Sequence, residues 1–260
     1  MTAGRRSHPA PPFEVRAVIA VVAHPDDESF GLGAVLDRLI EAGAEAGVLC
    51  FTRGEASTLH PDGGDLAEIR AAELRSASAV LGVGHTRLLD YPDGRLDQVP
   101  LDDLAGQVLR FARTVEPSHL LVFDTGGVTG HPDHVHATRA ALHAADELGM
   151  PVLGWTIPQD VADALNAEFG TGFTGHRDEE AGQRFRVDRT RQYRAIRCHR
   201  SQATDNPVLY RRLELLGAAE HVRLLRPAPE NQAGRKASGK DDHPAPAQAV
   251  DERTNSWITA

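Results

Sequence analysis

The chain contains two short stretches in which histidine and aspartate are packed around a proline. The first is Ala23-His24-Pro25-Asp26-Asp27-Glu28, and the second is Gly130-His131-Pro132-Asp133-His134. Positions i and i+3 fall on one face of a first helical turn, which pairs His24 with Asp27 and the two histidines of the second stretch with each other. Two histidines and a carboxylate that converge from two such turns make a three-ligand site. Catalytic zinc uses three protein ligands of this kind and keeps a fourth position for water.

Each stretch taken alone has a simpler explanation. A His-Pro pair at a helix start is commonly only a turn and a cap, and Asp27 could serve as an N-cap that satisfies backbone N–H groups. His136 and His143 are expected to lie on the surface. The metal interpretation gains its strength from the pair, because packing does not require two such polar turns at equivalent ends of two strands.

Both stretches follow apolar runs that are typical of buried strands. The first follows Val15–Val22, and the second follows His119–Phe123 through a glycine-rich loop. Further strands are expected at 46–51, 87–90, 152–156, 184–187 and 221–225. Helices are expected at 30–40, 65–81, 101–115, 131–148, 158–169, 190–200 and 207–216. Strands that alternate with helices predict βαβ units and a parallel sheet covered on both faces, in which the loops after successive strands lie along one edge. The two stretches are therefore expected to meet.

Composition bounds the function and the organisation of the chain. Its 260 residues are 41% hydrophobic and 25% charged, which is ordinary for a globular protein, and the formal net charge of -9 gives no general attraction to nucleic acid or anionic lipid. Two cysteines allow no disulfide framework. The first apolar run has about half the length of a membrane-spanning helix. We expect a cytoplasmic protein with a flexible segment at 1–14, one domain at 15–226 and a disordered, Pro- and Ala-rich tail at 227–260, and leave a homo-oligomer open.

Because it contains both turns, the chain resembles the PIG-L/LmbE-like metal-dependent N-acetylglucosamine de-N-acetylases. The two signatures of that family, A-H-P-D-D-E and H-P-D-H, are present without a change. The resemblance covers roughly residues 15–225 and includes five further stretches, namely Thr52–Glu55, Arg70–Leu74, Leu81-Gly82, Tyr91–Gly94 and His199–Gln202. It implies an α/β fold, a three-layer Rossmann-like sandwich with a mostly parallel central sheet.

The resemblance also implies a role for individual residues. His24, Asp27 and His134 are expected to bind zinc, and another divalent metal such as Fe²⁺ is an alternative. Asp26 is expected to be the general base. No nucleic acid and no membrane anchor are implied.

Other matched positions are assigned to the reaction and to the substrate. His131 is expected to stabilise the oxyanion or to act as an acid, with Asp133 polarising it. Arg70 is expected to grip a polar end of the substrate, and Arg53 and Asp93 are further substrate-binding candidates.

The function implied is a metal-dependent hydrolase that removes an acetyl or other acyl group from the amide nitrogen of an N-acetylglucosamine-type sugar or its conjugate. Within the same family, an amidase acting on a low-molecular-weight thiol conjugate or a glycopeptide is an alternative. A non-haem iron oxygenase, with a 2-His-1-carboxylate triad, is a remoter one. Some family members have a tyrosine where this chain has Thr129. The arginine-rich segment Gly170–Arg200 favours an acidic substrate or is simply a solvated surface.

Overall fold

The structure, a computed structural model, describes residues 13–59 and 64–228. The strands are β1 (Ala17–Val22), β2 (Glu45–Thr52), β3 (His85–Tyr91), β4 (His119–Phe123), β5 (Val152–Thr156), β6 (Gln183–Arg186) and β7 (Ala219–Arg226). The helices are α1 (Asp27–Phe30), α2 (Gly33–Glu41), α3 (Leu66–Leu81), α4 (Leu101–Val115), α5 (Pro132–Leu148), α6 (Gln159–Phe169), α7 (Thr190–Ile196), α8 (Arg200–Ala203) and α9 (Pro207–Leu216), with a 3₁₀ turn, η1 (Leu96–Gln98). The expected flexible segment and disordered tail lie almost wholly outside the described residues.

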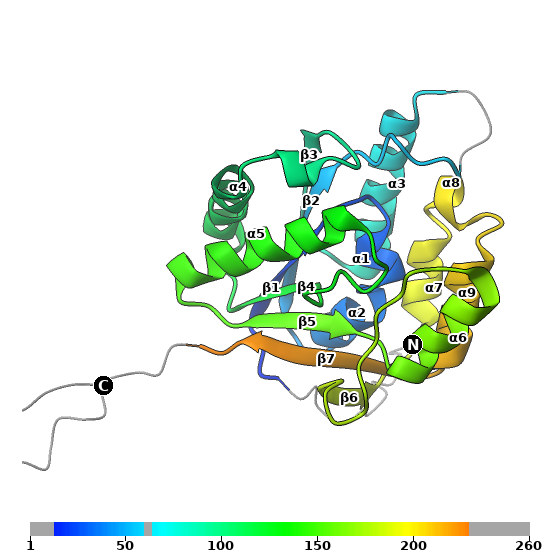
Figure 1. The fold of residues 1–260 in the computed structure, drawn as a ribbon. Coiled ribbons are helices and arrows are strands. Elements are labelled where there is room, and N and C mark those ends of the chain that lie inside the picture. The colour runs from blue at the N-terminus through cyan, green and yellow to red at the C-terminus, as the bar shows by residue number, and fades with distance from the viewer. Residues whose placement is uncertain (1–12, 60–63, 229–260) are drawn as a thin grey trace, which may run out of the picture. The chain divides into compact units, whose positions relative to one another are not determined.

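Strand β1 lies in the middle of the sheet and is buried along its whole length. Because side chains alternate across a strand, its residues divide between two cores. Val18 and Val22 pack with residues of α2, α3 and α6, whereas Ile19 and Val21 pack with residues of α4 and α5. The sheet is therefore covered by helices on both faces (Figure 1), and the expected three-layer arrangement is confirmed.

The seven strands are ordered β3-β2-β1-β4-β5-β7-β6. Strands β3, β2, β1, β4 and β5 pair in parallel, and β7 pairs antiparallel with both β5 and β6. The mostly parallel sheet is thus confirmed. The single reversed strand, β7, follows α9 after a short connection through Gly217 and Ala218 and lies between β5 and the edge strand β6.

The order of the strands reverses between β1 and β4. Val18 and Ala20 of β1 pair with His119 and Leu121 of β4. After β1 the chain passes to α1 and α2 on one face, and after β4 it passes to α5 on the other. Such a switch point opens a crevice at the carboxyl ends of the strands, where α/β proteins bind ligands. Both His-Pro-Asp turns lie at this point.

Two helices expected to be continuous are interrupted. The pattern at 30–40 divides into α1 and α2 around Gly31, where an added Cβ would lie 2.6 Å from Cζ of Phe123. Glycine therefore lets the backbone approach the aromatic core at the end of β4. The pattern at 190–200 likewise ends at Ile196, and α8 begins only after His199.

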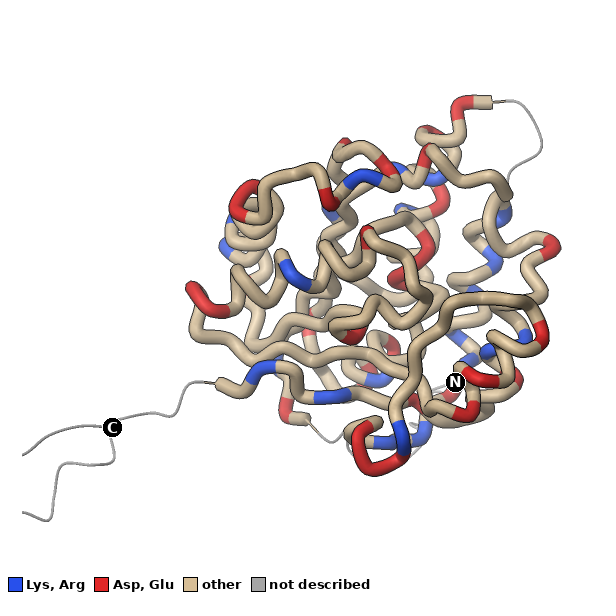
Figure 2. Tube along the Cα trace, in the orientation of Figure 1, with Lys and Arg blue, Asp and Glu red and all other residues tan. Residues whose placement is uncertain are grey.

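The distribution of charged residues and the hydropathy of the described helices match the ordinary composition of the chain. Acidic and basic residues are interspersed along the described trace (Figure 2). Within the described part of the chain, none of the helices has the length and apolar character needed to cross a bilayer.

The core around β1 and β2 makes a first prediction. Leu49 of β2 is fully buried among residues of α4 and β4, whereas Leu224 of β7 is 51% exposed. Leu49→Ala should lower the free energy of unfolding by about 2–5 kcal/mol, because it removes buried methyl groups and leaves a cavity. Leu224→Ala should change it by less than about 0.5 kcal/mol. Urea unfolding followed by circular dichroism measures both, and equal losses would contradict the burial assigned to Leu49.

Candidate metal centre

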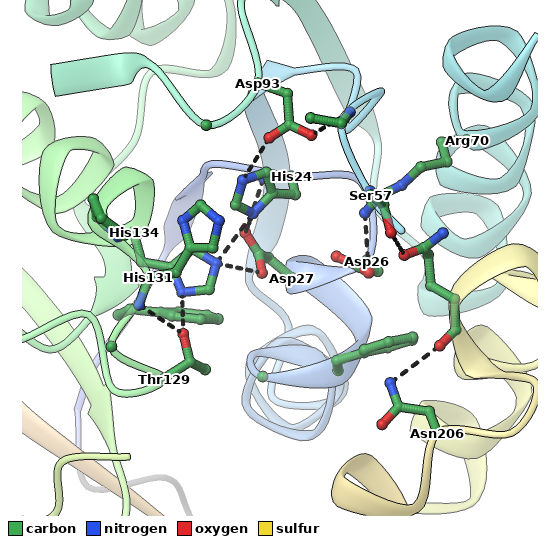
Figure 3. Close-up of a pocket in the computed structure, with 18 of the residues that line it drawn as sticks. His24, Asp26, Asp27, Ser57, Arg70, Asp93, Thr129, His131, His134 and Asn206 are labelled. Carbon is green, nitrogen blue, oxygen red and sulfur yellow. Dashed lines mark hydrogen bonds and ion pairs between the residues drawn. The ribbon is translucent and has the colours of Figure 1, made fainter. Parts of the chain in front are cut away.

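Three side chains from the two turns converge at the switch point. Nε2 of His134 lies 3.1 Å from Oδ1 of Asp27 and 3.1 Å from Nδ1 of His24. Their candidate ligand atoms all lie within 4.8 Å of one another, and all three residues are buried (Figure 3). His24 and Asp27 follow β1, and His134 lies in the first turn of α5. The structure therefore brings together the three residues expected to bind a metal.

The outer nitrogen of each histidine in the candidate donor set contacts an oxygen, and in His134 this contact fixes the position of the proton. Nδ1 of His134 lies 3.2 Å from the carbonyl oxygen of Gly127 and 2.7 Å from Oγ1 of Thr129. A carbonyl only accepts, so this nitrogen carries the proton and the lone pair of Nε2 faces inward. Such outer partners orient histidine ligands in metal sites.

His24 has the same arrangement with carboxylates in place of the carbonyl. Its Nε2 lies 3.1 Å from Oδ1 of Asp93 and 3.5 Å from Oδ2 of Asp133, as ion-pair contacts rather than aligned hydrogen bonds. Burial alone would lower the pKa of His24, but its contacts with Asp133, Asp27 and Asp93 raise that pKa well above the ordinary value. The two inward ring nitrogens lie 3.1 Å apart beside a carboxylate, where either a shared proton or a bound cation removes the repulsion between their lone pairs. A divalent metal fits this donor set.

Asp27 divides its two oxygens between the backbone and the centre. Oδ2 accepts hydrogen bonds from the backbone N–H groups of His24 and Ala23, at 2.9 and 3.2 Å, while Oδ1 faces His134. Burial opposes its ionisation, yet the neighbouring histidines hold the pKa of Asp27 well below its usual range. Asp27 is therefore charged in this setting and satisfies the turn at the same time.

Asp26 points away from Asp27, toward Arg70 (Figure 3). Its Oδ2 lies 3.0 Å from Nη2 of Arg70. Burial raises the pKa of Asp26 to about 6, against the opposing effect of Arg70. Its backbone has a φ of 139°, which is unusual for a residue other than glycine. Two adjacent aspartates thus have opposite pKa shifts.

His131 caps helix α5 and closes over the centre. Its Nδ1 accepts a hydrogen bond from the backbone N–H of Asp133 at 3.1 Å, and its ring packs edge-on against His24 with centroids 4.6 Å apart. Burial and the neighbouring histidines lower the pKa of His131. Since Nδ1 accepts, the proton of the neutral ring lies on Nε2.

The structure places Asp133 differently from the expectation that it polarises His131. Its oxygens accept from the backbone N–H groups of Gly94 and Leu96, at 2.8 and 3.1 Å, and face Nε2 of His24. Within the described residues, Asp133 contacts the His131 ring nitrogen through its backbone N–H. Its carboxylate instead faces His24, a histidine of the candidate donor set.

The three substrate-binding candidates have separate positions. Arg70 is buried, and it donates to the carbonyl oxygens of Gly54 and Pro25, both at 2.7 Å, besides its contact with Asp26. Arg53 pairs with acidic residues outside the cavity, Glu68 at 2.8 Å and Asp90. Arg53 is therefore not among the residues that line the cavity.

Asp93 and several residues that the sequence did not single out form the wall of the cavity. Asp93 lies in it, but its carboxylate contacts His24 and accepts from the Ala56 N–H at 2.9 Å. The cavity has a volume of about 640 Å³ and is also lined by Phe30, Ser57, Thr58, Phe123, Asn206 and Arg212. These side chains come from the ends of α1 and β4, from loops and from α9, where residue type alone gives no functional signal. Gly94 and Gln202 also line the cavity, and both lie within stretches that match the family, Tyr91–Gly94 and His199–Gln202.

Comparison with known proteins agrees with the geometry. The sequence pattern of the family described as "PIG-L: GlcNAc-PI de-N-acetylase" matches residues 19–145, which hold both turns. A 1D-myo-inositol 2-acetamido-2-deoxy-alpha-D-glucopyranoside deacetylase of Streptomyces avermitilis is 32% identical over 201 residues, or 62% of this chain and 68% of that protein. The chain belongs to the PIG-L family.

Other relatives show how much of their length this chain covers. A deacetylase of the same description from Kineococcus radiotolerans is 34% identical over 181 residues, covering 56% of this chain and 50% of that protein. The chain thus spans about half the length of the first curated relatives it matches.

Solved structures establish the fold. The A40926 pseudoaglycone deacetylase superposes with a TM-score of 0.62 at 21% identity, covering 81% of this chain and 97% of that one. The 4-carboxy-2-hydroxymuconate hydratase of Pseudomonas putida superposes with a TM-score of 0.63 at 18% identity, covering 84% and 100%. The protein has the LmbE-like fold, and because that fold also serves a hydratase, it does not by itself decide the reaction.

The contact between Thr129 and His134 makes a second prediction. Thr129→Val removes the hydroxyl that lies 2.7 Å from Nδ1 of His134 and should weaken metal binding by about tenfold, the lower end for lost outer-sphere partners, because the Gly127 carbonyl remains. Competition with a chromophoric chelator measures the affinity. Thr204→Val, which removes an exposed hydroxyl bonded to the Arg200 carbonyl, is the matched control. Equal affinities in both variants would show that Gly127 alone orients the ring.

Proposed function

We propose that this chain is a metal-dependent hydrolase that removes an acetyl or other acyl group from the amide nitrogen of an N-acetylglucosamine-type sugar or its conjugate. One observation carries the proposal. A buried His24–Asp27–His134 donor set and a separate carboxylate with a raised pKa, Asp26, line the same 640 Å³ cavity. That volume is within the range of small-molecule sites. Membership of the PIG-L family, and relatives described as acetamido-sugar deacetylases, support the substrate class.

His24, Asp27 and His134 would hold the metal, for which we propose zinc. When bound there, the metal would lower the pKa of water and polarise the acyl carbonyl. Nε2 of His134 faces the centre without a proton because Nδ1 of that ring donates to Gly127, whereas the carboxylates around His24 favour its protonated ring. Metal binding would therefore displace one proton, from Nδ1 of His24.

Asp26 would take the proton of the attacking water. Its carboxylate is oriented by Arg70 and is turned away from the metal-facing oxygens of Asp27, so it remains available as a base. A base with a pKa of about 6 is largely ionised at neutral pH and can still carry a proton onward to the leaving amine.

His131 would stabilise the oxyanion as a neutral donor. Nδ1 is occupied by the Asp133 backbone N–H, which leaves Nε2–H as the group able to donate. Burial disfavours the charged ring. This differs from a protonated imidazole held by the Asp133 carboxylate, because that carboxylate faces His24.

The test is release of free amine from a panel of N-acetylglucosaminides with inositol, sugar and organic-acid aglycones. Purified protein reconstituted with zinc should release amine, detected with fluorescamine, and protein stripped with a chelator should release none until metal is restored. If no member of the panel releases amine, the assignment of an amino-sugar substrate is overturned. Oxygen uptake with iron and an oxo-acid, without amine release, would instead favour an oxygenase.

The two adjacent aspartates make a further prediction. Asp26→Asn should keep the metal and lower kcat by about 100- to 10,000-fold, since it removes the base without changing the shape of the side chain. Asp27→Asn should lose metal, because the amide is a poor ligand in the position of Oδ1. Metal content by atomic emission and kcat are measured on the same preparations. If Asp26→Asn loses metal in parallel with activity, the two roles are exchanged.

A further inference from the structure

Two fully buried residues belong neither to the proposed metal ligands nor to the proposed general base. They are Glu28, the last residue of the first signature, and His199, the first residue of the His199–Gln202 stretch; each has a relative exposure of 0%. Although 171 positions separate them, Nε2 of His199 lies 2.7 Å from Oε1 of Glu28. Ser29 Oγ donates to the same oxygen at 2.5 Å.

The other oxygen of Glu28 reaches the backbone of the proposed base. Oε2 accepts a hydrogen bond from the N–H of Asp26 at 3.0 Å. Asp26 has φ 139° and ψ -25°, a conformation that a side chain other than glycine keeps only where its surroundings hold it. This conformation sends the Asp26 side chain toward Arg70 while the next side chain, that of Asp27, faces the histidines.

We propose that Glu28 and His199 are positioning residues for Asp26. His199 fixes the Glu28 carboxylate, and Glu28 holds the Asp26 backbone in the conformation that keeps its side chain in the cavity and out of the metal-facing set. The effect on turnover rests on the proposed function, whereas the effect on the Asp26 backbone does not.

Several neighbours hold the buried pair in place. Burial alone would disfavour the charged ring, but Glu28 raises the pKa of His199 above its ordinary value. The His199 ring packs edge-on against Phe30, with centroids 5.7 Å apart. Gln192 of α7 donates to the carbonyl oxygens of Ser29 and Phe30, at 3.0 and 3.2 Å. Residues late in the chain thus hold the turn that carries Asp26.

A neighbouring contact provides the control for a merely structural role. The N–H and Oγ of Ser201 donate to Oε1 and Oε2 of Glu73, at 2.8 and 2.6 Å. This pair ties α8 to α3 without reaching Asp26. Glu73→Gln therefore loosens the same segment and leaves the Glu28–His199 contact in place.

The kinetic test compares His199→Leu, His199→Gln and Glu73→Gln in the zinc-loaded full chain. His199→Leu should lower kcat by about 100-fold, the scale of a misplaced catalytic group, with KM within about twofold and metal content unchanged. His199→Gln, which offers a side-chain N–H donor to Glu28, should recover most of kcat, and Glu73→Gln should stay within about twofold of the parent enzyme. Equal losses in His199→Leu and Glu73→Gln, or a loss confined to metal content, would overturn the proposal.

The structural test uses crystal structures of the same variants and reads the Asp26 backbone. In His199→Leu the φ of Asp26 should leave the positive region, and in His199→Gln it should stay there. Should His199→Leu fail to fold, the isosteric Glu28→Gln carries the same comparison against Glu73→Gln. An unchanged Asp26 conformation in these variants overturns the positioning role. If the parent protein releases no amine from the panel, the proposed function fails, and this structural comparison still decides the role of Glu28 and His199.

Discussion

The site depends on one constraint, the pairing of β1 with β4 as parallel neighbours whose following helices leave to opposite faces. Val18 and Ala20 pair with residues of β4, so the turns that follow these strands end at the same height on the sheet edge. Because the chain passes to α1 after one strand and to α5 after the other, the crevice between the turns is not filled by a connecting segment. Ligands from distant parts of the sequence meet there without any direct link between the turns.

The second constraint is the cost of gathering carboxylates at a buried point. Each of three carboxylates, Asp27 within the donor set and Asp93 and Asp133 beside it, also accepts a backbone N–H. Asp27 accepts from the turn before it, Asp133 from Gly94 and Leu96, and Asp93 from Ala56. Amide dipoles thus stabilise these anions from outside, and the remaining oxygens face the histidines. The same carboxylates raise the pKa of His24, so they favour positive charge at the centre.

The sequence predicts the parts of this arrangement that follow from periodicity and local chemistry. A run such as Val18–Val22, followed by turn residues, is typical of a buried strand. The second His-Pro-Asp turn starts a helix because Pro132 suits the first helical turn and His131 caps it. Right-handed crossovers then bring the two turns to one edge. The types of ligand residue and the fold class can therefore be predicted from the sequence. The helix break at Gly31 cannot be predicted in this way, because it depends on the Phe123 ring, which lies against Gly31 only in the folded protein.

Pairwise choices among nearby polar groups could not be predicted either. Asp133 lies next to His134 and two residues after His131 in the sequence, yet its carboxylate faces His24, which follows β1. Arg70 matches a substrate-binding position, but its Nη1 and Nη2 groups donate to the carbonyl oxygens of Gly54 and Pro25, and Nη2 also pairs with Asp26. Differences of a few ångströms decide such partners, and they arise from the packing of whole elements rather than from spacing along the chain.

The first turn shows how two identical neighbours acquire different chemistry. Asp26 and Asp27 have the same side chain and share one buried turn, but burial raises the pKa of the first while the histidines lower that of the second. Pairs of acids with pKa values driven apart by their surroundings are how enzymes obtain separate roles from one residue type. The separation needs the side chains to diverge, and the positive φ of Asp26 provides it at a cost of about 1–3 kcal/mol for such a conformation. A strained backbone at this one position is therefore the means by which one aspartate is freed from the donor set that holds the other.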